Sequence, residues 1–189
     1  MKISEIANQI NKSRFYLASK IMKNILLIFS ILFSTLSFSQ GQRQSYHDML
    51  KTYYKNTVAT IQPSELYKKM LKGEKIIILD TREQKEYSVS KIKGAIHVGY
   101  DKFDIKSSDT FDRNTTVVVY CTIGARSENI GEKLKKEGFK KVFNLYGGLI
   151  YWKNQGYPVV DKSGKPTQNI HVYSAEWGKW LKKGNAVSN

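Results

Sequence analysis

Apolar residues in this chain occur in short runs that are separated by polar segments. Two runs, 76–79 and 117–120, are fully apolar and rich in β-branched residues, which predicts strands buried on both faces. Shorter runs at 58–61 and 141–145 predict two further strands, and 93–98 reads as a turn that enters another extended segment. These runs predict the strands of one sheet.

Segments with apolar residues three or four positions apart lie between the strands. One predicted helix starts at Pro63 and ends at Gly73, and a short one covers 83–87. The segment 127–138 has a helical pattern with a glycine stop, and two glycines open another helix at 147–156. Strands that alternate with helices are typical of a parallel α/β sheet.

Functional sites in parallel α/β sheets lie beyond the carboxyl ends of the strands. Asp80 ends one of the two buried strands, and Cys121 directly follows the other. Both positions are therefore candidates for a site.

An apolar stretch near the start of the chain, 25–38, is too short to span a bilayer, which takes about 20 residues. Lys23 precedes it and small residues up to Gln40 follow it, which is the layout of a secretory signal peptide over about residues 22–39. We expect cleavage near Gln40.

Met22 makes a conventional start for such a signal, so we interpret residues 1–21 as an upstream extension of the coding sequence. The predicted localisation is exported, either periplasmic or secreted, with no membrane span in the mature form. A retained signal anchor is the alternative.

Composition divides the chain into four parts. Residues 1–40 are the extension and signal peptide, 41–56 are a lead-in segment, and 57–160 form the predicted domain. Residues 161–189 are a basic tail with a short amphipathic helix at 173–183. That helix carries two tryptophans three positions apart, which favours docking on the domain over binding to a membrane surface.

The net charge is +15, and a quarter of the residues are charged. Because the lysines are spread along the chain without a recognition-helix pattern, we predict a basic surface that attracts small anions and no nucleic-acid partner. The three histidines, His47, His97 and His171, lack metal-ligand spacing, so no metal and no cofactor are expected.

Cys121 is the only cysteine in the sequence, which excludes an intramolecular disulfide. An unpaired cysteine in an exported protein is a reactive thiol or an intermolecular partner. Here a predicted helix start and Arg126 would both stabilise a thiolate, and Gly124 permits a tight loop. The alternative is an inert cysteine in the core.

Four blocks of sequence resemble the single-domain rhodanese (thiosulfate sulfurtransferase-like) family. They are Leu79–Arg82 with Glu86 and Tyr87, Ile92–His97, Val119–Ser127, and Leu145–Leu149 with Trp152 and Gly156–Val159. Together they span roughly 58–160. One departure is Ser90-Lys91-Ile92, where the family usually has Gly-His-Ile.

The resemblance implies a three-layer α/β fold with a central parallel sheet flanked by helices, and an enzyme that transfers sulfane sulfur. Cys121 is the implied nucleophile, and Asp80 and Arg82 are implied supporting residues. The implied active-site and anion-binding loop consists of Thr122, Ile123, Gly124, Ala125, Arg126 and Ser127. Arg126 would orient this loop and help to bind the anionic donor, and an ion pair that only braces the loop is the alternative. A small anionic donor such as thiosulfate, and cyanide, a thiol or a protein as acceptor, are the implied partners.

Loop length separates the classes of this family. Cys121 to Arg126 is a six-residue loop, as in the sulfur-transferring members, whereas related phosphatases and arsenate reductases carry one residue more. A non-catalytic persulfide carrier or binding module, a phosphatase or arsenate reductase, and a thiol redox sensor are the alternatives.

Overall fold

The structure is a computed structural model that describes residues 22–24 and 46–188. The chain divides into two units, Met1–Met49 and Leu50–Asn189. In the first unit, residues 22–24 and 46–49 are helical. Most of the predicted signal peptide lies outside the described residues, and none of the helices described is long and apolar enough to cross a membrane.

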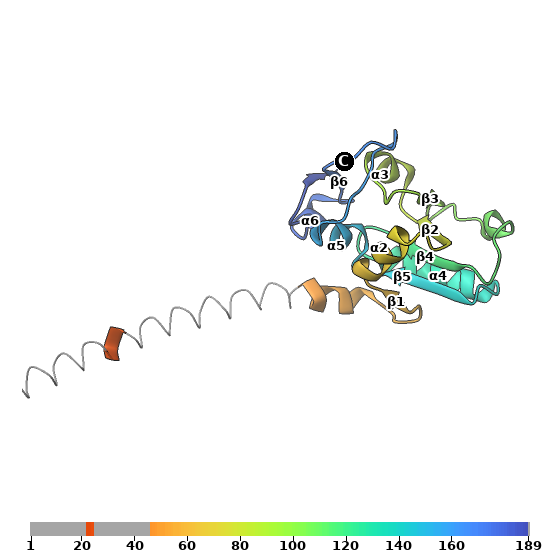
Figure 1. Cartoon of the computed structure of the whole chain (residues 1–189), viewed down its shortest axis with the longest axis horizontal. Helices are drawn as coiled ribbons and strands as arrows, with labels where there is room; N and C mark the ends of the chain where they lie inside the picture. Colours follow the sequence, from red (N-terminus) through yellow and green to blue (C-terminus); the bar gives the residue numbers. More distant parts are fainter. Residues whose placement is uncertain (1–21, 25–45, 189) are drawn as a thin grey trace, which may run out of the picture. The chain divides into compact units, whose positions relative to one another are not determined.

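The second unit contains a five-stranded parallel sheet with the order β1-β5-β4-β2-β3 (Figure 1). The strands are β1 (Thr60–Ile61), β2 (Ile76–Asp80), β3 (Ile96–His97), β4 (Thr116–Tyr120) and β5 (Lys141–Leu145). The register pairs Asp80 of β2 with Tyr120 of β4, so the two central strands end at the same level. Cys121 therefore leaves the sheet at its carboxyl edge, as predicted.

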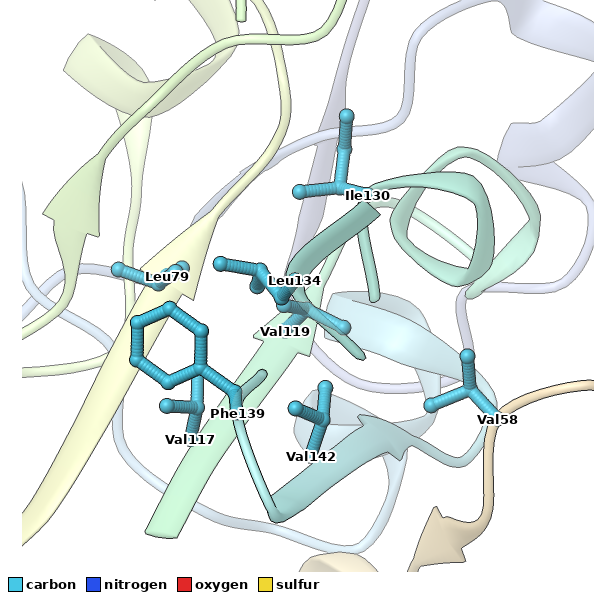
Figure 2. Packing of buried hydrophobic residues seen from close by; sticks show 8 residues of the cluster. All are labelled: Val58, Leu79, Val117, Val119, Ile130, Leu134, Phe139 and Val142. Atoms are coloured by element: carbon cyan, nitrogen blue, oxygen red, sulfur yellow. The ribbon is translucent and has the colours of Figure 1, made fainter. Parts of the chain in front are cut away.

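Helices flank the sheet and follow the strands in alternation, which confirms the predicted α/β class. They are α2 (Pro63–Leu71), α3 (Gln84–Val89), α4 (Ala125–Lys136) and α5 (Gly148–Asn154), with a 3-10 turn at Ile105–Ser108. Ile130 and Leu134 of α4 pack on Val117 and Val119 of β4 and on Phe139 (Figure 2). This buried cluster holds α4 against the strand that carries the cysteine.

The central strands are buried on both faces, as their unbroken apolar runs predict. Val117 and Val119 face α4, so alternation turns Val118 and Tyr120 toward the opposite face. All four side chains are fully buried. Helices on both faces of a parallel sheet explain why this strand needs no polar position.

The tail differs from the sequence prediction. The helix predicted over 173–183 is a single turn, α6 (Ala175–Gly178), between strands β6 (Asn169–His171) and β7 (Asn185–Val187). These two strands pair in parallel, and β6 contacts α3. Because such a short helix has little stability of its own, tertiary packing decides the structure of this segment.

The start of one strand and the start of one helix also differ from the predictions. The strand predicted at 58–61 pairs only over Thr60–Ile61, and α4 begins at Ala125, before the predicted start at residue 127. Gly124 adopts the left-handed conformation as the residue preceding the helix, with φ of 105°. The apolar pattern could not show this start because the first turn of α4 belongs to the loop motif.

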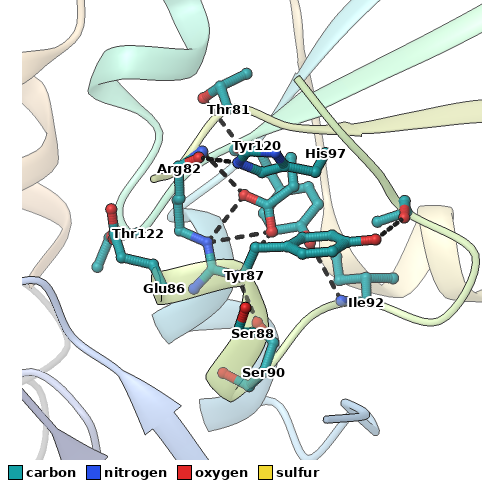
Figure 3. A network of polar contacts seen from close by, with 12 residues as sticks. Thr81, Arg82, Glu86, Tyr87, Ser88, Ser90, Ile92, His97, Tyr120 and Thr122 are labelled. Atoms are coloured by element: carbon teal, nitrogen blue, oxygen red, sulfur yellow. Dashed lines mark hydrogen bonds and ion pairs between the residues drawn. The ribbon is translucent and has the colours of Figure 1, made fainter. Parts of the chain in front are cut away.

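A buried ion pair closes the carboxyl end of β2 (Figure 3). Arg82 Nη2 lies 2.7 Å from Asp80 Oδ2, and neither side chain is exposed. The Arg82 guanidinium also donates to the carbonyl of Ser90. Burial alone would lower the pKa of Arg82, but the charge of Asp80 raises it above its usual range. The pair thus ties β2 to the segment that follows α3.

Replacing Asp80 by Asn is expected to lower the free energy of unfolding by about 3–5 kcal/mol, because Arg82 becomes a buried cation without its counterion. Urea denaturation measures this change. The matched control is Asp109→Asn, which removes an exposed partner of Arg113 at 3.3 Å and should cost less than about 1 kcal/mol. Equal losses in both variants would contradict the structural role of the Asp80–Arg82 pair.

Candidate active site

The candidate site is the loop between β4 and α4. Cys121 begins it directly after Tyr120, Gly124 is the residue before α4, and the predicted active-site loop continues through the first turn of that helix to Ser127. The backbone amide of Gly124 donates to Cys121 Sγ across 3.1 Å. A loop amide at a helix start therefore points at the sulfur, which favours a negative charge there.

The start of α5 holds the first half of the loop. The amide of Leu149 donates to the carbonyl of Cys121 at 2.9 Å, and the amide of Ile150 donates to that of Thr122 at 3.1 Å. Gly148 makes this approach feasible, because a Cβ there would lie 2.5 Å from the Cys121 carbonyl oxygen. Its φ of +56° is also one that side-chain-bearing residues rarely adopt.

Tyr54 supports the loop from a segment that precedes β1. Its hydroxyl donates to the carbonyl of Ile123 and accepts from the amide of Gly147, both at 2.8 Å. Burial raises the pKa of Tyr54 well above its ordinary value, so the hydroxyl stays protonated. A side chain on Gly124 would collide with this ring. Tyr54 therefore joins the loop to the turn before α5.

The second half of the loop is held by β5. Asn144 donates to the carbonyl of Gly124 at 2.8 Å, and the Ser127 hydroxyl lies 2.8 Å from Asn144 Oδ1. All three residues of this contact are buried. Ser127, predicted as part of the anion-binding loop, thus also uses its hydroxyl to brace the loop.

Arg126 forms an ion pair with Glu86 of α3. Its two terminal nitrogens each lie 2.9 Å from a different carboxylate oxygen, and the Thr122 hydroxyl donates to Glu86 Oε1 at 3.0 Å. Glu86 is fully buried, whereas one fifth of the Arg126 side chain is exposed. Of the two roles expected for Arg126, a cation that helps to bind an anionic donor and one half of an ion pair that braces the loop, this contact with Glu86 fits the ion pair.

The pKa of Glu86 reflects this pairing. Burial would raise it, but the hydrogen bonds and charge of Arg126, together with the amide of Glu83, hold it below its ordinary range. The same pair raises the pKa of Arg126, against the lowering effect of burial. Both groups are therefore ionised at neutral pH, and together they fix the position of the loop relative to α3.

A pocket of about 210 Å³ lies beside the loop. The loop residues that line it are Cys121, Thr122, Ile123, Ala125 and Arg126; the remaining lining residues are Tyr53, Tyr173 and Trp177. Cys121 itself is only 1% exposed. The pocket is therefore the cavity that borders this thiol.

The structure places the predicted site residues in three groups. Five line the pocket, whereas Gly124 and Ser127 shape the loop behind it. Asp80 and Arg82 are fully buried and do not line the pocket. In the part of the chain that the structure describes, no three His, Cys, Asp or Glu side chains gather in a way that could hold a metal ion.

Sequence reasoning missed several contributors. Glu86 belongs to one of the four sequence blocks that resemble the family, but nothing in its spacing indicates Arg126 as its partner 40 positions away. Tyr54 and the three aromatic residues of the pocket come from the lead-in segment and the tail. The two tryptophans of the tail favour docking on the domain, but neither their spacing nor the tyrosines of the lead-in segment indicate where the rings pack.

Replacing Glu86 by Gln should destabilise the protein by about 3 kcal/mol at neutral pH, because Arg126 loses its counterion in a largely buried position. Since the pKa of Glu86 is depressed in the folded state, its contribution is fully present above the ordinary glutamate pKa of about 4.3 and is lost progressively as the pH falls from there through the lowered folded-state pKa. Chemical denaturation across pH 3–7 measures the difference between wild type and variant.

The difference in unfolding free energy between wild type and Glu86→Gln should therefore decrease as the pH falls. The control is Glu65→Gln, which removes one carboxylate from an exposed position of α2. A gap that stays constant from pH 7 to pH 3 would contradict the assigned role of Glu86.

Comparisons with known proteins support the resemblance to the rhodanese family. The rhodanese-like domain family matches residues 62–155. The thiosulfate sulfurtransferase GlpE of Coxiella burnetii is 34% identical over 84 residues, covering 44% of this chain and 78% of the relative. A sulfurtransferase of Allochromatium vinosum is 30% identical over 107 residues, covering 57% of this chain and 99% of that protein.

Among solved structures, the rhodanese-like domain of the Alr3790 protein from Anabaena superposes with a TM-score of 0.50 at 25% identity. The match covers 54% of this chain and 78% of that structure. Fold, loop and relatives agree, and the chain belongs to the rhodanese-like domain family.

Proposed function

We propose that this protein is a sulfurtransferase that carries a sulfane sulfur on Cys121 as a persulfide. The observation that supports this most directly is the Gly124 amide directed at Cys121 Sγ within a six-residue loop. The names of its relatives point to the same reaction class.

The first half-reaction loads the cysteine. The Cys121 thiolate attacks the outer sulfur of a donor such as thiosulfate, a new S–S bond forms, and sulfite leaves with the electron pair of the broken bond. The Gly124 amide, which contacts Sγ, is positioned to stabilise the negative charge of the persulfide. No proton transfer is required because both sulfur nucleophile and leaving group are anions.

The second half-reaction unloads it. Cyanide or a thiolate attacks the outer sulfur of the persulfide, and the Cys121 thiolate leaves with the electron pair. Neither half-reaction requires a metal or a cofactor, because the sulfur is transferred from one nucleophile to the next. Steady-state kinetics with donor and acceptor varied should follow a ping-pong pattern, since the donor product leaves before the acceptor reacts.

Loop length supports transfer of sulfur over transfer of phosphate. The sequence has only Thr122, Ile123 and Gly124 between Cys121 and the first residue of α4. A tetrahedral oxyanion requires a wider ring of amides than a single sulfur atom. Hydrolysis of p-nitrophenyl phosphate that disappears in Cys121→Ser would favour the phosphatase alternative.

Incubation with thiosulfate should add about one sulfur atom to the intact mass of the protein, and cyanide should remove it with formation of thiocyanate. Cys121→Ala should show neither change, because the nucleophile is absent. A folded protein that gains no mass, although its thiol can be alkylated, would exclude thiosulfate as donor. Loading without turnover would instead indicate a carrier.

We also propose that residues 22–39 direct export. Expression of the full chain in a bacterial host should give a mature protein that starts near Gln40, as read by mass spectrometry of the periplasmic or secreted fraction. A mature form that starts well before Gln40 would contradict the assigned signal peptide.

A further inference from the structure

Three aromatic side chains surround the approach to Cys121, and we refer to Tyr53, Tyr173 and Trp177 as the aromatic collar. None of them lies within residues 62–155, the part of the chain that matches the family. Tyr53 precedes β1, and the other two belong to the segment between β6 and β7. The segments flanking the family domain therefore complete the wall of the pocket.

The collar is held in place by specific contacts. The rings of Tyr53 and Trp177 meet edge to face with centroids 5.2 Å apart. The Arg126 guanidinium lies over the Tyr173 ring, 4.9 Å from its centroid. The collar is thus joined both within itself and to the loop.

The backbone of Tyr173 adopts a conformation that is unusual for a residue other than glycine. Its φ is +68°, in the left-handed region where a bulky side chain is disfavoured. Its amide donates to His171 Nδ1, and the next amide, of Ser174, donates to the carbonyl of Val172. Strained residues of this kind concentrate where a side chain must be presented at a site.

The loop and the collar offer different surroundings to a bound molecule, because the loop directs the Gly124 amide at Sγ, whereas the collar presents uncharged rings. Arg126 is the only cationic residue among those that line the pocket, and Glu86 already pairs with its guanidinium. An anionic group in contact with the collar would lose hydration without gaining a counterion. An uncharged ring would instead bury apolar surface against aromatic faces. The volume of about 210 Å³ corresponds to about seven water molecules.

We infer that the aromatic collar selects as sulfur acceptor a thiol with an uncharged, aromatic body of about one ring. This inference rests on the proposed sulfurtransferase function and concerns its second half-reaction. The acceptor thiolate attacks the outer sulfur of the Cys121 persulfide, an S–S bond to the acceptor forms, and the Cys121 thiolate is released. The collar acts by positioning the acceptor body while its sulfur reaches the persulfide.

Acceptor competition tests this inference. With the full chain and thiosulfate as donor, we compare kcat/KM for benzyl mercaptan, for the anionic 2-mercaptoethanesulfonate and for cyanide, which is too small to span the collar. Benzyl mercaptan should be preferred over the anionic thiol. Trp177→Ala or Tyr53→Ala should lower the ratio of benzyl mercaptan to cyanide by about fivefold, as expected for the loss of one aromatic contact.

Trp180→Ala is the matched control. It removes the same side chain three positions further along the same segment, and Trp180 does not line the pocket. In this variant, the ratio of kcat/KM for benzyl mercaptan to that for cyanide should equal the wild-type ratio. A preference for 2-mercaptoethanesulfonate, or unchanged ratios in both collar variants, would overturn the inference.

A second readout does not depend on turnover. Because Cys121 is the only cysteine, its alkylation by iodoacetamide and by N-benzyliodoacetamide can be followed by intact mass. The ratio of the alkylation rate with N-benzyliodoacetamide to that with iodoacetamide should be higher for Cys121 than for free N-acetylcysteine. In the collar variants, this ratio should fall toward that of N-acetylcysteine. If no persulfide forms, the proposed function fails, and the alkylation ratios still decide whether the collar binds an aromatic body.

Discussion

The two hydrogen bonds from the start of α5 to the carbonyls of Cys121 and Thr122 are the contact on which the site depends. They orient the loop so that its Gly124 amide turns inward to the sulfur. The contact requires Gly148 at the point of closest approach, because a side chain there would displace the loop backbone. A turn after β5 thus determines the shape of a loop after β4, and the parallel sheet brings the two together at one edge.

Charge is used mainly to fix positions in this protein. The Asp80–Arg82 pair is fully buried at the end of β2, and Glu86 holds Arg126 beside the loop. Both arginines are therefore balanced by carboxylates, although the net charge of the chain is +15. An excess of lysine attracts anions over a distance, whereas the contact with the sulfur itself comes from the backbone amide of Gly124.

The family domain and its flanking segments contribute differently. The loop, its glycines and its flanking helices lie within residues 62–155, the part of the chain that matches the family. Tyr54, which joins the loop to the turn before α5, and the aromatic collar lie outside that range. The loop that carries Cys121 thus lies in the part that matches the family, whereas the three aromatic residues of the pocket wall lie in the flanking segments. The tail, from its composition a basic extension, is in the structure part of the unit that holds the site.

Local pattern determined the strands of the five-stranded sheet, most helices, the position of Cys121 and the family, because unbroken apolar runs, glycine stops and a loop motif are recognised within a few residues. The strands β6 and β7 escaped prediction, and α6 is shorter than the helix predicted at 173–183, because the stability of this segment comes from packing. Only the tertiary structure paired Glu86 with Arg126, since contacts across 40 positions leave no periodic signal. It likewise decided the collar, because the sequence shows where aromatic residues occur but not which cavity they face.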